Sequence, residues 1–174
     1  MATQFKLEHE FLDIPLAVFE AHLNDPELTK RIKQGLGFDE RKLVSHKESK
    51  DSTEWSFLVK KHGDMPKALQ KIFKDGGLSW LEQSRFVRDE HCIYWDIKPE
   101  SNLIQFHGHG TWQLASKGAG CKRVIEGSVN VQIPLVGKMI ETFIVNELVK
   151  TYEIEPTIQR EFYRWVMKKD AHAH

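Results

Sequence analysis

The sequence predicts an α+β domain in which a curved antiparallel sheet of about six or seven strands wraps around a long C-terminal helix. Three observations lead to this prediction: residues 5–11 alternate between apolar and polar, strand-like segments with short turns follow in the middle of the chain, and the apolar period becomes helical after residue 134. Strands joined by such short turns run antiparallel, because a parallel connection needs a dozen or more residues. The sheet has one apolar face to bury, and only the last helix is long enough to cover it.

Two short helices are expected after the first strand. Asp13 and Pro15 introduce the segment LAVFEAHLND, with Asp13 as a possible cap and Pro15 near the first turn. Asp25 and Pro26 begin a second helix, PELTKRIKQG, and Gly35 and Gly37 are expected to end it.

The middle of the chain then reads as strands. The predicted strands are FDERKLVSHKES, DSTEWSFLVKKH and residues 78–87, 92–97, 103–114 and 122–133. A short amphipathic helix, MPKALQKIFKDGG, interrupts them after the second segment.

The terminal helix should begin at Pro134, whose fixed φ suits a helix start, with Gly137 allowing close approach to the sheet. Its apolar face continues through Ile140 and Leu148, and Pro156 is expected to kink or break it. We expect one domain over residues 1–169 and a disordered tail over residues 170–174.

Composition excludes several classes of function. Lys and Arg number 25, as do Asp and Glu, so the chain lacks the basic excess of a nucleic-acid binder. Its two cysteines are too few for a disulfide framework, and its first residues lack the pattern of a secretory signal, so a cytoplasmic location is expected. The most apolar stretch, IPLVGKMIETFIVNELV, carries too many charges for a membrane span.

The order of elements, with IPLVGKMIE joining the last strand to the last helix, resembles the START-like superfamily (SRPBCC, helix-grip or polyketide cyclase/lipid-transport-like). The segment FLDIPLAVFEAHLND is similar to the usual beginning of that fold. More narrowly, MPKALQKIF and IPLVGKMIETFIVNEL resemble an uncharacterised START-like family in which the last strand ends at a proline and the helix starts with a Gly and a Glu. Those positions are Pro134, Gly137 and Glu141 here.

This resemblance implies a helix-grip fold with a hydrophobic cavity between the sheet and the terminal helix. Superfamily members bind sterols, phospholipids, polyketides, plant hormones or quinone-type ligands, and they include both enzymes and partner-binding modules. Fold alone does not choose among these functions.

Apolar side chains in phase on the strands and the helix are the candidates for the cavity wall. They are Trp55, Phe57, Trp80, Trp95, Ile104, Phe106, Trp112, Val129, Val131, Ile140, Phe143 and Ile144. For any one of them alone, ordinary core packing is favoured, and the cavity is implied by the fold resemblance.

Two glutamates are possible polar groups of the cavity. Glu82 is in phase with Trp80, and Glu141 lies near the apolar face of the helix. A carboxyl group inside an apolar cavity has a raised pKa and can act as an acid or base. For Glu141 we favour a structural role near the helix start, where the helix dipole stabilises its charge.

His107 and His109 share one face of a predicted strand, as a metal-binding pair would. The strand phase turns them outward unless the glycines beside His109 form a bulge. No Cys or His motif elsewhere has metal spacing, although His91, Glu126 or Glu82 on neighbouring strands could supply a third ligand. No catalytic motif occurs either, so the sequence assigns no metal, cofactor or catalytic residue.

The leading hypothesis is non-catalytic binding, for transport or sensing, of a hydrophobic small molecule or lipid. The cavity entrance is placed near residues 16–23 and 66–73. One alternative is a cyclase or hydrolase acting on an aromatic or polyketide substrate in the same cavity. A second alternative is a regulatory module with a filled core that binds a partner protein, and the oligomeric state is left open.

Overall fold

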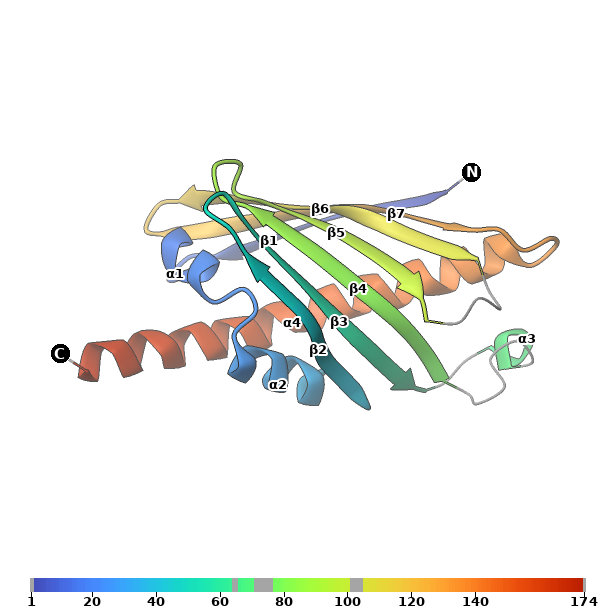
Figure 1. Ribbon diagram of the computed structural model, residues 1–174, viewed down its shortest axis with the longest axis horizontal. Coiled ribbons are helices and arrows are strands. Elements are labelled where there is room, and N and C mark those ends of the chain that lie inside the picture. Colours follow the sequence, from blue (N-terminus) through green and yellow to red (C-terminus); the bar gives the residue numbers. More distant parts are fainter. Residues whose placement is uncertain (1, 64–65, 71–76, 101–104, 174) are drawn as a thin grey trace.

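The computed structural model describes residues 2–63, 66–70, 77–100 and 105–173. Its elements are β1 (Thr3–Phe11), α1 (Leu16–Ala21), α2 (Pro26–Gly35), β2 (Glu40–Glu48), β3 (Ser52–His62), α3 (Lys67–Gln70), β4 (Gly77–Val87), β5 (Cys92–Pro99), β6 (Phe106–Lys117), β7 (Gly120–Val131) and α4 (Gly137–His172). The seven strands form one antiparallel sheet in the order β1-β7-β6-β5-β4-β3-β2. Helix α4 crosses one face of this sheet, with α1 and α2 beside its C-terminal half (Figure 1). The predicted fold class is therefore confirmed.

Alternation along each strand decides which side chains meet α4. On β3, for example, Trp55, Phe57 and Val59 are buried on the same face. On β6, Phe106 is buried while His107 and His109 are exposed, so the two histidines lie on the face of the sheet opposite to Phe106. The two histidines stack at 5.0 Å between ring centroids on the outer face, where His107 pairs with Asp96. The outward orientation predicted for them is confirmed.

Buried apolar residues form two clusters along α4. The first lies around α1, α2 and the C-terminal half of α4, and includes Phe19, Leu28 and Phe162. The second lies between the N-terminal half of α4 and strands β5, β6 and β7. Trp80 and Trp112 pack against both clusters, so the middle of the sheet joins them.

Helix α4 differs from its prediction in three ways. It begins at Gly137 rather than Pro134, because residues 134–136 form a turn in which Leu135 has a positive φ of 69°. It continues through Pro156 without a break, since Pro156 and the preceding Glu155 are buried and tertiary packing of this face outweighs the lost backbone hydrogen bond. It also extends to His172, so part of the predicted disordered tail is helical.

The close approach of the helix to the sheet at Gly137, predicted from the sequence, is confirmed. A Cβ atom there would lie 2.7 Å from the carbonyl oxygen of Val131, which is closer than real contacts allow. The first turn of α4 therefore sits directly against the end of β7.

Candidate functional site

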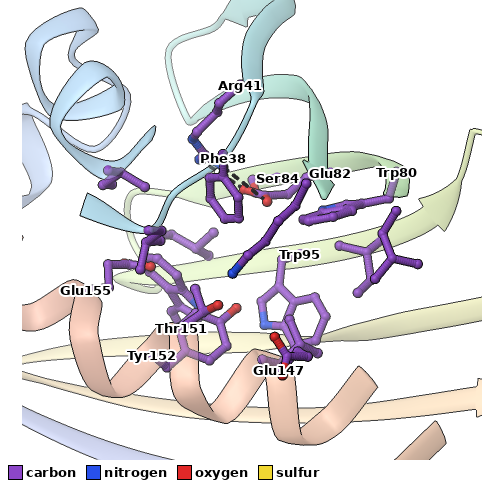
Figure 2. Close-up of a pocket in the computed structure, with 18 of the residues that line it drawn as sticks. Phe38, Arg41, Trp80, Glu82, Ser84, Trp95, Glu147, Thr151, Tyr152 and Glu155 are labelled. Carbon is purple, nitrogen blue, oxygen red and sulfur yellow. Dashed lines mark hydrogen bonds and ion pairs between the residues drawn. The ribbon is translucent and has the colours of Figure 1, made fainter. Parts of the chain in front are cut away.

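A cavity of about 140 Å³ lies between the sheet and the middle of α4. Strands β3 to β6 form one wall, α4 forms the opposite wall, and α2 contributes Leu28 and Ile32. Leucines, isoleucines and large aromatic side chains make up most of the lining, and the Phe and Trp residues among them are Phe38, Trp55, Trp80, Trp95, Phe106 and Trp112. Figure 2 shows several of these rings facing residues of α4 across the space.

Some of the predicted cavity residues line this space and others do not. Those that line it are Trp55, Trp80, Trp95, Phe106, Trp112, Ile144 and the polar candidate Glu82. Those elsewhere are Phe57, Val129, Val131, Ile140, Phe143 and Glu141. Ile104 lies outside the described residues.

The residues that do not line the cavity pack elsewhere for identifiable reasons. Val129, Val131 and Ile140 fill the second core cluster, because the first turns of α4 lie too close to β7 to leave a space. Phe143 is partly buried against the same cluster. Phe57 is covered by the guanidinium of Arg41, which lies 4.1 Å from its ring centroid.

Glu141 holds the start of α4 to the sheet. Its carboxylate accepts hydrogen bonds from the backbone N–H of Val131 at 2.9 Å, the hydroxyl of Thr3 at 3.0 Å and the ammonium of Lys138 at 3.3 Å. Burial alone would raise the pKa of this carboxyl group, but the three donors outweigh it and the pKa is lowered. Its role is structural, as favoured from the sequence.

An ion pair lines the cavity near the edge of the sheet. Arg41 on β2 donates two hydrogen bonds to Glu82 on β4, at 3.2 and 3.1 Å. The side chains are only 12% and 26% exposed, so the pair is held in a partly desolvated setting.

A second ion pair lies deeper, on the α4 side. The fully buried Arg123 donates to Glu155 at 3.1 Å, and Gln159 donates to the same carboxylate at 2.9 Å. Arg123 also lies 4.4 Å from the ring centroid of Trp112. Burial raises the pKa of Glu155, although the charges of Arg123 and Arg41 oppose that shift.

Tyr152 adds a buried phenol to the lining. Burial raises the pKa of its phenol, and the ring makes an edge contact with Trp112 at 5.9 Å between centroids. The hydroxyl is therefore neutral and able to hydrogen-bond.

Sequence reasoning missed Arg41, Tyr152, Glu155 and Gln159. The α4 residues were detectable, because the helical spacing that begins at Ile144 continues through positions 148, 152, 155 and 159. The expected break at Pro156 hid this continuity. Arg41 carried no such signal, since its orientation depends on the pairing of β2 with β3 and the irregularity after Leu43.

Other kinds of site find no support among the described residues. No group of three or more His, Cys, Asp or Glu side chains there is arranged to hold a metal ion. Cys92 and Cys121 are free and buried, and burial raises the pKa of the Cys121 thiol to about 11. No helix in the described parts of the chain is long and apolar enough to cross a membrane.

The antiparallel sheet around a long helix, with a cavity between them, is a helix-grip fold, so the fold that the sequence resemblance implied is confirmed. The chain belongs to the family described as "Protein of unknown function (DUF2505)", whose model matches residues 8–162. A comparison with curated protein sequences gives no match.

Solved structures share the fold at low sequence identity. The TTHA0849 protein of Thermus thermophilus is 14% identical with a TM-score of 0.65, over 94% of this chain and 99% of that one. The Zhui aromatase/cyclase of a Streptomyces species is 9% identical with a TM-score of 0.63, over 93% and 94%. Human STARD10 is 13% identical with a TM-score of 0.61, over 97% and 68%. Identities this low establish the fold and not the function.

Proposed function

We propose that this protein binds a small hydrophobic molecule in the cavity between the sheet and α4. The observation that carries the proposal is the lining itself, in which four tryptophans surround a space whose lining carboxylates are already paired with cations. Apolar walls with a few placed polar groups are typical of small-molecule sites.

The size of the cavity favours a compact ligand over a long lipid. Its volume of about 140 Å³ is close to the ~150 Å³ of a cavity that holds one benzene ring. Sites for drug-sized ligands occupy roughly 300–1,000 Å³. A single aromatic ring with small substituents therefore fits this cavity, whereas a phospholipid would require the sheet and helix to separate.

Thermal unfolding with ring-sized compounds such as ethylbenzene and indole tests the proposal. A ligand at 100 times its dissociation constant stabilises the folded state by about 2.7 kcal/mol, which raises the Tm of a domain of this size by roughly 5–10 °C.

Ser84 offers a way to close the cavity. It lines the space and is paired in register with Trp55 and Trp95, so Ser84→Leu should abolish the shift by filling the volume. Gln83→Leu, at the adjacent exposed position of β4, is the matched control and should keep the shift. No Tm increase with any apolar ring compound would refute the proposal.

A cyclase- or hydrolase-type activity is the second candidate, and one observation favours it. Glu82, Glu155 and Tyr152 all reach the cavity, and the raised pKa of Glu155 suits a proton donor. Of the two glutamates named from the sequence as polar cavity groups, however, only Glu82 lines the space. Turnover of an aromatic or polyketide substrate that is lost in Glu155→Gln and kept in Glu141→Gln would establish an enzyme.

The third hypothesis, a partner-binding module with a filled core, is weakened by the presence of the cavity. It would regain support if cavity-filling variants such as Ser84→Leu left every biological effect of the protein unchanged.

A further inference from the structure

We infer that the ligand of this cavity is a neutral ring compound carrying an acceptor oxygen, such as a carbonyl, and a hydroxyl group. This inference rests on the proposed function and specifies the chemistry of the molecule bound there.

Four buried polar atoms of the lining have no hydrogen-bond partner within the described protein. They are Nε1 of Trp95, Nε1 of Trp112, Nε of Arg41 and Oε1 of Gln159. A buried polar group without a partner is costly, and native structures keep few of them. These four atoms, three donors and one acceptor, therefore point to groups that a bound molecule supplies.

Trp95 defines the acceptor on the ligand. Its side chain comes from the central strand β5 and is only 6% exposed, and its indole nitrogen can donate but not accept. Figure 2 shows the indole standing in the space between the sheet and α4. A carbonyl or ether oxygen on the ligand satisfies this donor.

Gln159 defines the donor on the ligand. Its Nε2 donates to Glu155, which Arg123 holds in place, so the amide orientation is fixed by its partners. The free atom of this 3% exposed side chain is then the oxygen, an acceptor. A hydroxyl on the ligand matches it.

The charges of the lining select a neutral molecule. Each lining carboxylate already has a cationic partner: Glu82 pairs with Arg41, Glu147 with Lys150 and Glu155 with Arg123. The remaining lining cation, Lys61, places its ammonium 5.6 Å from the ring centroid of Phe38. An anionic ligand would lose its hydration and would face three carboxylates, and Lys61 would be the only lining cation in the described part of the chain without a carboxylate partner to receive it.

Calorimetric titration of the wild-type protein with four related probes tests this inference. Ethylbenzene supplies only the ring, acetophenone adds the acceptor, 4-hydroxyacetophenone adds both groups, and benzoate adds a charge. We expect affinity to rise by about 2- to 12-fold with each added hydrogen bond, and we expect no measurable binding of benzoate.

Trp95→Phe removes the indole donor and keeps an aromatic ring. It should abolish most of the preference for acetophenone over ethylbenzene. Trp80→Phe is the matched control, because Trp80 lines the same cavity and its nitrogen is not among the buried unpartnered atoms. That variant should weaken both probes alike and leave their ratio unchanged.

The possible outcomes separate the two levels of the proposal. If no probe binds, ethylbenzene included, the proposed function fails and this inference fails with it. If ethylbenzene and acetophenone bind equally well to the wild-type protein, or Trp95→Phe keeps their ratio, the cavity binds apolar rings and the inference alone is overturned. Tight binding of benzoate would equally overturn it.

Discussion

The two halves of α4 each carry one buried glutamate, and these glutamates are in opposite electrostatic situations. Glu141, 4% exposed, accepts hydrogen bonds from three donors, and its pKa is lowered. Glu155, 5% exposed, is bonded to Arg123 and Gln159, and burial raises its pKa. The ionised form of Glu141 is therefore more stable than it would be in water, and the ionised form of Glu155 is less stable.

The difference separates the first turns of the helix, which fix it to the sheet, from its middle, which lines the site. Around Glu141 the helix lies against β7, as the close approach of Gly137 to the carbonyl oxygen of Val131 shows. Around Glu155 the helix borders the cavity, and polar atoms without partners belong to the lining. A site of this kind is a region where stability is given up for the capacity to bind.

The largest expected effect comes from breaking the ion pair at Glu155. Arg123→Met keeps the length of the side chain but leaves the carboxylate buried without its cation, so the free energy of unfolding should fall by about 3–5 kcal/mol. Urea denaturation followed by tryptophan fluorescence measures this loss.

A double variant distinguishes the lost charge from lost packing. Arg123→Met combined with Glu155→Leu removes both charges, and should recover much of the stability because a buried pair is often replaceable by apolar residues. If the double variant is as unstable as Arg123→Met alone, the packing of Arg123 on Trp112 and Phe11 matters more than the charge.

At the other half of α4 the expected effect is smaller. Glu141→Ala leaves the buried N–H of Val131 without an acceptor, which should cost about 1–3 kcal/mol of unfolding free energy. Glu153→Ala, at an exposed position of the same helix, is the control and should stay within about 0.5 kcal/mol of wild type. If Glu141→Ala and Glu153→Ala lose the same unfolding free energy, Glu141 does not anchor the start of the helix to the sheet.

The sequence predicted the fold better than the site. Strand alternation and turn lengths depend on residues that are close in the sequence. The antiparallel sheet, the outward histidines and the role of Gly137 could therefore be predicted from it. The cavity depends on how far α4 stands from the sheet along its length, which no local pattern encodes. Val129 and Ile140 were therefore placed in a cavity that lies further along the helix, and Arg41 and Glu155 were missed because their partners are distant in the chain.

The smallest expected effect is a pH dependence at the Glu155 end of α4. His9 lies there, 3.3 Å from the guanidinium of Arg123. Burial and the charges of Arg123 and Arg160 lower the pKa of its imidazole from 6.5 to about 4. Between those values the unfolded chain binds a proton that the folded protein does not, so stability must fall as pH falls through this window.

His9→Gln removes that titration and keeps an acceptor for Arg123. Its unfolding free energy should therefore decline less than that of the wild type between pH 6.5 and 5, by about 1 kcal/mol after allowance for partial exposure. His46→Gln, at an exposed position of β2, controls for the loss of a histidine. Parallel pH profiles for wild type and His9→Gln would show that burial and the charges of Arg123 and Arg160 do not lower the pKa of His9, and the contrast between the two parts of α4 would then rest on the glutamates alone.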